Sequence, residues 1–135
     1  MAAKKLHLDV ITPFEKVFSG EIDGIMAPGH EGYFGVLPGH APMMMQLSIG
    51  EMKLKVDNKD YLYATSGGFA EILPDKITIL AEAAESADKI DIERATRARE
   101  RAEQRLARKS EDIDLDRARM ALARALNRLK VASRR

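Results

Sequence analysis

Arginines gather in the last third of the chain, and their spacing suggests a shared task. Arg94 and Arg101 are seven residues apart, so they would lie two turns apart on one face of a helix. Arg124 and Arg128 are four residues apart and would also share a helical face. A guanidinium presents paired, planar donors that match phosphate oxygens. If the two segments fold back antiparallel, these four side chains predict a polyphosphate site.

A solvated basic face would explain the same arginines without any ligand. Glu93, Glu100 and Glu103 are interspersed among them and could pair with them. The pattern I-D-x-x-R-A also occurs twice, at 90–95 and 113–118, and both copies can be explained as helix starts with an Asp cap. What distinguishes the first copy is the preceding Glu85 together with the three further arginines.

Two helices are expected to position these arginines. One should run from Asp91 to about Lys109 and the other from Asp114 to about Val131, with both aspartates as N-caps and the break at 110–112. So short a link favours an antiparallel hairpin. Their apolar stripes are thin, consisting of Ala95, Ala98, Ala102 and Leu106 in the first helix and Leu115, Ala118, Leu122, Ala125 and Leu129 in the second. Small side chains bury little area, so we expect a weakly held hairpin that could open.

Composition divides the 135 residues into two units. All nine Gly, all five Pro and all seven aromatic residues lie at or before Pro74. Residues 1–87 carry seven Lys, no Arg and 12 acidic groups, for a net charge of −5, whereas 88–135 carry 12 Arg, three Lys and nine acidic groups, for +6. The sum is the net +1 of the whole chain. We therefore predict two domains, 1–87 and 88–135.

The first unit is expected to be built of short strands. Residues 6–10 and 52–56 alternate apolar with polar side chains, the period of a half-buried strand. Bulky residues also alternate over 14–25, a turn at 57–60 leads into 61–65, and Gly67-Gly68 is expected to break that strand. A further pair, 69–73 and 76–80, flanks Pro74-Asp75. The predicted fold class is α+β, an antiparallel β-sandwich followed by a two-helix hairpin.

Other residue types with chemical potential have ordinary explanations. His7, His30 and His40 are more often hydrogen-bonded to backbone than bound to metal, and no metal site is predicted. The glycine-rich stretch 29–39 lacks the Lys-Ser/Thr ending of a phosphate loop and is interpreted as turns. Met43, Met44 and Met45 suit either core or an adaptable contact surface.

Several classes of protein are disfavoured by composition. The absence of cysteine excludes disulfides and thiolate chemistry, and no run reaches the ~20 apolar residues of a membrane-spanning helix. The N-terminus lacks a signal-peptide core, so we expect a soluble intracellular protein. An Arg-rich nucleic-acid-binding module remains an alternative, weakened because the basic unit has no aromatic residue and nine acidic ones. A nucleotide-dependent enzyme is a further alternative, without an evident nucleophile and base.

Two motifs in the first unit resemble a known family. Residues 35–42, Gly-Val-Leu-Pro-Gly-His-Ala-Pro, and residues 66–72, Ser-Gly-Gly-Phe-Ala-Glu-Ile, are similar to the epsilon subunits of bacterial F-type ATP synthases. The order of the two units matches as well, so the resemblance covers nearly the whole chain. It implies a sandwich of about ten strands followed by two helices.

The resemblance also implies a role. Such subunits are non-catalytic parts of the central rotor stalk, at the cytoplasmic face of the cell membrane. The resemblance implies that the sandwich contacts the gamma subunit and the ring of c subunits. In the extended state the helices would reach the alpha and beta subunits and inhibit ATP hydrolysis. No nucleic-acid partner and no catalytic cofactor are implied.

In bacillus-like members of this family, the folded hairpin binds ATP as a regulatory ligand, with or without Mg²⁺. The family pattern falls here on Glu85, Ile90, Asp91, Arg94, Ala95, Arg101, Arg124 and Arg128. By this resemblance Glu85, Ile90 and Asp91 would address the adenine end and the arginines the phosphates. Ala95 would leave room for the nucleotide. Binding would favour the folded, non-inhibitory state.

Overall fold

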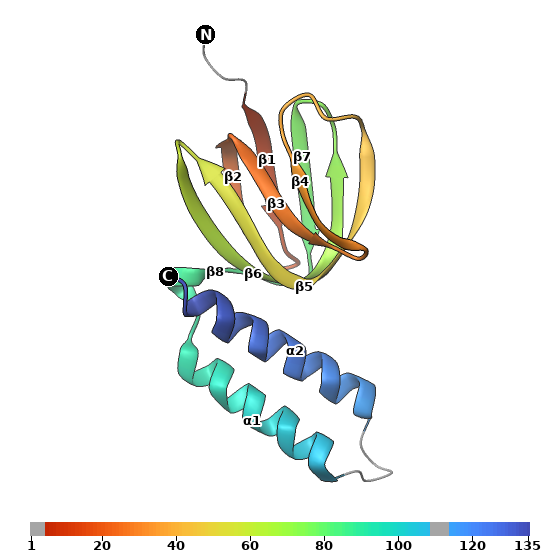
Figure 1. The fold of residues 1–135 in the computed structure, drawn as a ribbon, viewed down its shortest axis with the longest axis vertical. Helices are drawn as coiled ribbons and strands as arrows, with labels where there is room; N and C mark the ends of the chain where they lie inside the picture. Colours follow the sequence, from red (N-terminus) through yellow and green to blue (C-terminus); the bar gives the residue numbers. More distant parts are fainter. Residues whose placement is uncertain (1–4, 109–113) are drawn as a thin grey trace.

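The computed structural model describes residues 5–108 and 114–135. Within these ranges the chain forms eight strands, a 3₁₀ turn (η1, Ala87–Lys89) and two helices (Figure 1). The strands are β1 Leu6–Ile11, β2 Lys16–Ile22, β3 Gly24–Gly29, β4 Gly32–Val36, β5 Met43–Val56, β6 Lys59–Ile72, β7 Lys76–Ala81 and β8 Ala84–Ser86. The helices are α1 Ile92–Arg108 and α2 Leu115–Ala132. The predicted β-sandwich followed by two helices is confirmed.

The strands form one continuous, folded-over sheet. Its order is β2-β1-β7-β6-β5-β3-β4, with β8 paired to β6. Neighbours are antiparallel except β1 and β7, which run parallel. Eight strands are described where about ten were expected, because β5 and β6 are each 14 residues long and pair along almost their whole length. Figure 1 shows these long strands curving beneath the sandwich, where the helical hairpin lies against them.

The core lies between the inward faces of these strands. Leu6, Leu8 and Val10 of β1 are fully buried, as are Met52 and Leu54 of β5. The alternation seen in the sequence therefore corresponds to alternation across the sheet. Burial of this face fixes the strand register, because a slip by one residue would expose every core side chain.

Gly67-Gly68 does not break its strand, contrary to the sequence prediction. β6 continues through both glycines, and Gly68 pairs with Leu47 and Ala81. The φ angles of Gly67 and Gly68 are +93° and +134°, a region that side chains rarely adopt. A Cβ atom on Gly68 would lie 2.0 Å from the carbonyl oxygen of Leu80. The glycines bend the strand and allow β7 to approach closely, so pairing continues.

Two other strand boundaries differ from the prediction. Residues 12–15 form a turn, and the expected strand over 14–25 divides at Asp23 into the end of β2 and the start of β3. The turn between β5 and β6 consists only of Asp57 and Asn58, with φ of 51° and 66°. Two residues with positive φ are the usual requirement of a tight hairpin, so the flanking residues can join the strands.

The helices start where the sequence predicts. Asp91 Oδ1 accepts from the Arg94 backbone N–H at 3.1 Å, and Asp114 Oδ1 from that of Arg117 at 3.1 Å. Figure 1 shows α1 and α2 side by side and antiparallel. Alanines make the contact, with Ala95, Ala102, Ala118 and Ala125 all buried. The predicted break at 110–112 and the predicted end at Lys109 lie outside the described residues.

Candidate functional site

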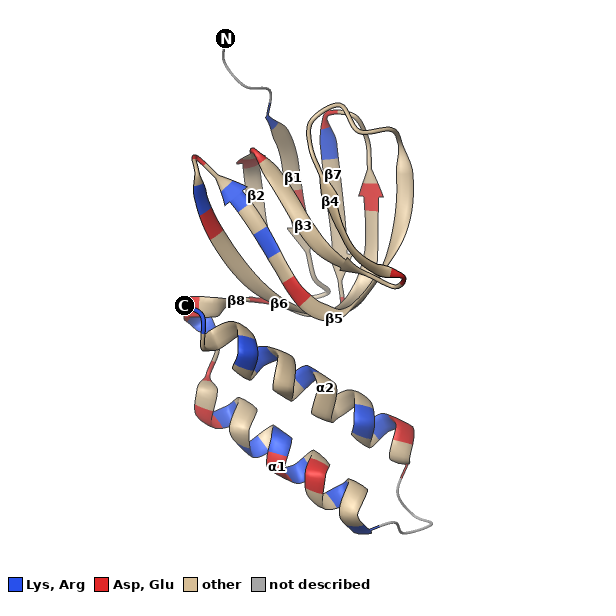
Figure 2. Ribbon diagram, in the orientation of Figure 1, with Lys and Arg blue, Asp and Glu red and all other residues tan. Residues whose placement is uncertain are grey.

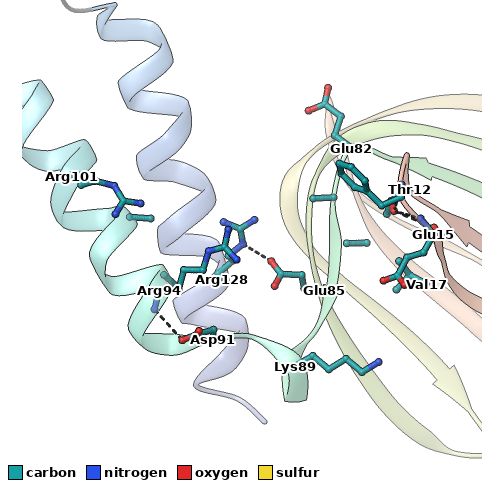
Figure 3. Close-up of a pocket in the computed structure, with 15 residues that line it drawn as sticks. Thr12, Glu15, Val17, Glu82, Glu85, Lys89, Asp91, Arg94, Arg101 and Arg128 are labelled. Atoms are coloured by element: carbon teal, nitrogen blue, oxygen red, sulfur yellow. Dashed lines mark hydrogen bonds and ion pairs between the residues drawn. The ribbon is translucent and has the colours of Figure 1, made fainter.

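A cavity of about 500 Å³ lies where the helical hairpin meets the sandwich (Figure 3). Its walls come from the β1–β2 turn, the segment from Glu82 to Glu85, and one face each of α1 and α2. This volume is within the range of small-molecule sites. The lining includes six of the eight residues predicted for nucleotide binding: Glu85, Asp91, Arg94, Ala95, Arg101 and Arg128.

One wall of the cavity is basic. Arg94 and Arg101 project from α1 and Arg128 from α2, so both helices contribute cations (Figure 3). Ala95 and Ala98 lie between the α1 arginines, and their small side chains leave space in the cavity next to α1. Within residues 5–108 and 114–135, neither Arg94 nor Arg101 forms an ion pair. Their guanidinium groups are therefore available to an anionic ligand.

Carboxylates face the arginines and already engage part of the site. Arg128 Nε donates to Glu85 Oε1 at 2.6 Å, with side chains 32% and 37% exposed. Asp91 caps α1 through the Arg94 backbone N–H while lining the cavity. Glu85 therefore neutralises part of the charge that Arg128 offers to an anionic ligand, while the Nη groups of Arg128 keep donors outside this contact.

Two predicted residues lie elsewhere. Ile90 is 3% exposed and packs with Val131 and Ala132 in a small core between η1 and the end of α2. Arg124, one turn before Arg128, lines an adjacent small cavity with Asn127 and Thr65. Ile90 is thus a core residue next to the lining residue Asp91, and Arg124 lines the adjacent cavity rather than this one.

Several lining residues were missed by sequence reasoning. Thr12, Phe14 and Glu15 come from the β1–β2 turn and Val17 from β2, 77 to 82 residues before Arg94, and Glu82 precedes β8. The only local signal was the turn-forming Thr12-Pro13 pair. Nothing in the local pattern shows which turn of the sandwich faces the hairpin.

Side chains of α2 and of the residues after it hold α2 against the sandwich and against the segment 87–90. Asn127 Nδ2 donates to the Gly50 carbonyl at 2.9 Å, and Arg134 forms an ion pair with Glu51 of β5. Arg135 donates to the carbonyls of Ala87 and Ile90, each at 3.2 Å. α1 contacts chiefly α2. The basic wall is consequently held in place through α2.

The structure also locates the glutamates, histidines and methionines for which the sequence offered explanations without a ligand. Of the three interspersed glutamates, Glu103 pairs with Arg99 at 3.5 Å and not with a predicted site arginine. His40 Nδ1 lies 2.8 Å from the Ala41 carbonyl, while His7 lies between Glu21 and Asp9. Among the described residues no group of His, Asp and Glu could hold a metal ion. Met44 is 65% exposed, as an adaptable contact surface would require.

Charge follows the two units seen in the sequence. Figure 2 shows Lys and Arg spaced along both helices, with Asp and Glu mainly at their starts and among the α1 cations. Neither described helix has the length and apolar character needed to cross a membrane.

Comparison with known proteins identifies the same two parts. Residues 5–87 match the family described as ATP synthase, delta/epsilon chain, beta-sandwich domain. Residues 88–133 match ATP synthase, delta/epsilon chain, long alpha-helix domain. Together these matches cover nearly the whole chain.

Individual relatives are similar along their full length. The ATP synthase epsilon chain of Pelotomaculum thermopropionicum is 52% identical over 132 residues, 98% of each chain. That of Syntrophobacter fumaroxidans is 48% identical over 132 residues, again 98% of each chain. That of Halalkalibacterium halodurans is 49% identical over 130 residues, covering 96% of this chain and 98% of the relative.

Solved structures agree in fold. A chain of the Euglena gracilis mitochondrial ATP synthase superposes with a TM-score of 0.82 at 24% identity, covering 100% of this chain and 84% of that one. A chain from the central stalk and c-ring structure of the Tetrahymena thermophila enzyme gives 0.58 at 15%, covering 99% and 98%. From the family matches and the full-length identities, this chain belongs to the ATP synthase delta/epsilon chain family.

Proposed function

We propose that this chain is a non-catalytic, epsilon-type subunit of the central stalk of an F-type ATP synthase. The support is the full-length identity of about half to relatives named ATP synthase epsilon chain. In this role the sandwich binds the gamma subunit and the c-subunit ring, peripheral to the cytoplasmic face of the cell membrane. The helices, when extended, reach the alpha and beta subunits and inhibit ATP hydrolysis. The nucleic-acid alternative finds no support in these relatives.

The division of labour follows the two units. Residues 1–87 would supply the contacts with gamma and the ring, and residues 88–135 would be the regulatory unit. The second unit is attached by few contacts, mostly through α2, and its helices touch each other through alanines. Little apolar area is buried between the two helices in that way, so they can separate from each other at modest cost. Release of the hairpin from the sandwich also requires loss of the Arg128–Glu85 and Arg134–Glu51 ion pairs and of the packing of Val131.

ATP is the proposed regulatory ligand of the folded hairpin. The observation that carries this proposal is the cavity itself, whose lining comes from the sandwich, α1 and α2 together. A ligand that contacts all three holds the hairpin folded and has no complete site once it extends. Arg94, Arg101 and Arg128 would bind the phosphates, with Arg124 one turn away on α2.

The remaining predicted residues would address the other end of the nucleotide. Glu85 and Asp91 offer carboxylate oxygens to the amino group of adenine, Ile90 supports that end from the core, and Ala95 leaves space above α1. Mg²⁺ would accompany the ligand through its phosphates. No catalytic cofactor is part of this proposal.

ATP would regulate inhibition by raising the population of the folded hairpin. A ligand that binds only the folded hairpin stabilises it by RT ln(1 + [L]/Kd), about 2.7 kcal/mol at a hundredfold excess over Kd. At concentrations near Kd the effect is below about 0.5 kcal/mol. The affinity relative to cellular ATP therefore decides whether the nucleotide or the protein contacts control the hairpin.

The test uses ATP hydrolysis by the assembled enzyme. Wild-type chain and Arg94→Ala are each reconstituted with the alpha, beta and gamma subunits, and inhibition is followed as ATP is raised. We expect ATP to relieve inhibition by the wild type and to fail to relieve it with Arg94→Ala. The same ATP dependence for both chains would contradict the proposed site. Failure of the chain to join the complex would contradict the subunit role.

A further inference from the structure

An aromatic ring stands at the lip of the candidate nucleotide cavity. Phe14 lines the cavity and is 93% exposed, the most exposed large apolar side chain among the described residues. Its ring buries almost nothing against the protein, so it adds little to the stability of the fold. No packing role therefore explains a phenylalanine at this position.

The turn that carries this ring is well fixed. The Thr12 backbone N–H donates to the Glu15 carbonyl at 2.9 Å, closing the turn. The Thr12 hydroxyl accepts from the backbone N–H groups of Phe14 at 3.3 Å and Glu15 at 3.2 Å. Pro13, between them, restricts φ. A preorganised backbone leaves only side-chain rotation to be lost when a ligand covers the ring.

The cavity separates two kinds of chemistry. Figure 3 shows Arg94, Arg101 and Arg128 on the helical side and Thr12, Glu15 and Val17 on the opposite side. The lining on the sandwich side combines apolar groups, Phe14, Val17, Ala83 and Ala84, with the carboxylates of Glu15, Glu82 and Glu85. Such a site suits a ligand with an anionic part and a flat, weakly polar part. Inorganic polyphosphate has only the first of these, whereas a nucleoside triphosphate has both.

We propose that Phe14 stacks on the base of the bound nucleotide and makes the cavity selective for a purine nucleoside triphosphate over bare polyphosphate. This inference rests on the proposed function, whose arginine site it extends. The edge of the base faces Glu85, and one of its flat faces lies on Phe14. Purines are favoured because their two-ring face covers the phenyl ring more completely.

Calorimetric titration of the full chain with ATP and, separately, with inorganic tripolyphosphate tests the proposal. Stacking on an aromatic side chain is worth about 1–3 kcal/mol per base, so Phe14→Ala is expected to weaken the binding of ATP about tenfold. Tripolyphosphate affinity should change less than about twofold. Phe14→Trp should keep ATP binding and report it by a fluorescence change, because the chain has no other tryptophan.

Phe69→Ala is the matched control, since Phe69 is 51% exposed and lies outside the cavity lining. The thermal melt of Phe14→Ala should be unchanged, because its ring buries almost nothing, and both variants are titrated below their melting temperatures. If Phe14→Ala loses affinity for ATP and tripolyphosphate equally, or loses affinity for neither, the stacking role is overturned while the arginine site remains intact. Absence of any ATP binding by the wild type would overturn the proposed ATP site and this inference together, while the subunit role would stand or fall by assembly with the complex.

Discussion

Arg128 Nε donates to Glu85 Oε1 at 2.6 Å, so that a cation of the second helix is held by a carboxylate of β8. The pair lies in the wall of the candidate cavity and bridges the hairpin and the sandwich. Glu85 engages only the Nε of Arg128, so a phosphate that binds the other N–H donors of Arg128 shares this cation with Glu85. Ligand binding and hairpin docking are therefore coupled through one ion pair.

Neutralising Glu85 should make the cavity more attractive to phosphate. In Glu85→Gln, Arg128 loses its carboxylate partner and the negative charge leaves the wall. The side chains of the pair are about one-third exposed, so the change should be modest. We expect tripolyphosphate to bind about twofold to fivefold more tightly. Calorimetry with tripolyphosphate measures it, with Glu71→Gln on β6 as a control outside the cavity. Weaker tripolyphosphate binding would show that Glu85 instead positions Arg128.

Asn127→Ala should loosen the hairpin. Its side chain donates to the carbonyls of Gly50 at 2.9 Å and Thr65 at 3.4 Å, and both bonds are lost. A hydrogen bond contributes about 1 kcal/mol, and the 3.4 Å contact is long, so loss of the Gly50 bond alone should raise the open population about fivefold. Amide hydrogen exchange along α2 should accelerate, whereas the exposed Lys130→Ala should leave it unchanged. Equal protection in the two variants would exclude a docking role for Asn127.

The acid side of the stability curve should depend on Asp9. The Ser19 hydroxyl, which donates to Asp9 Oδ1 at 2.6 Å, holds the pKa of that carboxyl below its ordinary value of 3.8, with Lys16 and His7 helping. A lowered folded-state pKa gives stability that is present above the ordinary pKa and lost as pH falls through the folded-state pKa.

Ser19→Ala should therefore move the Asp9 pKa upward and shift acid unfolding to higher pH. Carbon-detected NMR titration of the Asp9 carboxyl measures the first effect, and circular dichroism against pH measures the second. Ser48→Ala serves as a control, because the Ser48 hydroxyl contacts only a backbone carbonyl at 3.5 Å. An unchanged Asp9 titration in Ser19→Ala would show that the hydroxyl is not the main cause.

Gly68→Ala should destabilise the sandwich strongly. A Cβ there would meet the Leu80 carbonyl oxygen at 2.0 Å, and φ is +134°. We expect a loss of about 2 kcal/mol or more in the free energy of unfolding. Gly35→Ala is the control, because its Cβ would approach only the Ile25 carbonyl, at 3.8 Å. Denaturant unfolding compares them, and equal midpoints would contradict the close approach of β6 and β7.

Local patterns were sufficient for much of the fold. Leu6, Leu8 and Val10 alternate as a half-buried strand must, and Asp91 and Asp114 precede helical runs as caps must. The prediction at Gly67-Gly68 was wrong. A pair of glycines usually ends a strand, but here β6 bends at the pair and continues. What kept it paired was the approach of β7, a tertiary contact that no local pattern encodes.

The site was predictable in part for the same reason. Spacing along one helix brought Arg94 and Arg101 together, and antiparallel folding brought Arg128 to them. Phe14 and Thr12 could not be placed because they enter the cavity from a turn far away in the sequence. The burial of Ile90 depends on Val131 near the end of α2, which packs against it in the fold but lies 41 residues later in the sequence.

The central claim is that the arginine wall binds ATP, and calorimetric titration of the isolated chain with ATP tests it most directly. Arg94→Ala removes a lining guanidinium but keeps the Asp91 cap, which uses the backbone N–H. Arg97→Ala removes an α1 arginine outside the lining and preserves the same net charge as Arg94→Ala. We predict saturable binding that Arg94→Ala weakens at least tenfold and Arg97→Ala leaves within about twofold. Equal affinities in the two variants, or no saturable binding at millimolar ATP, would contradict the account.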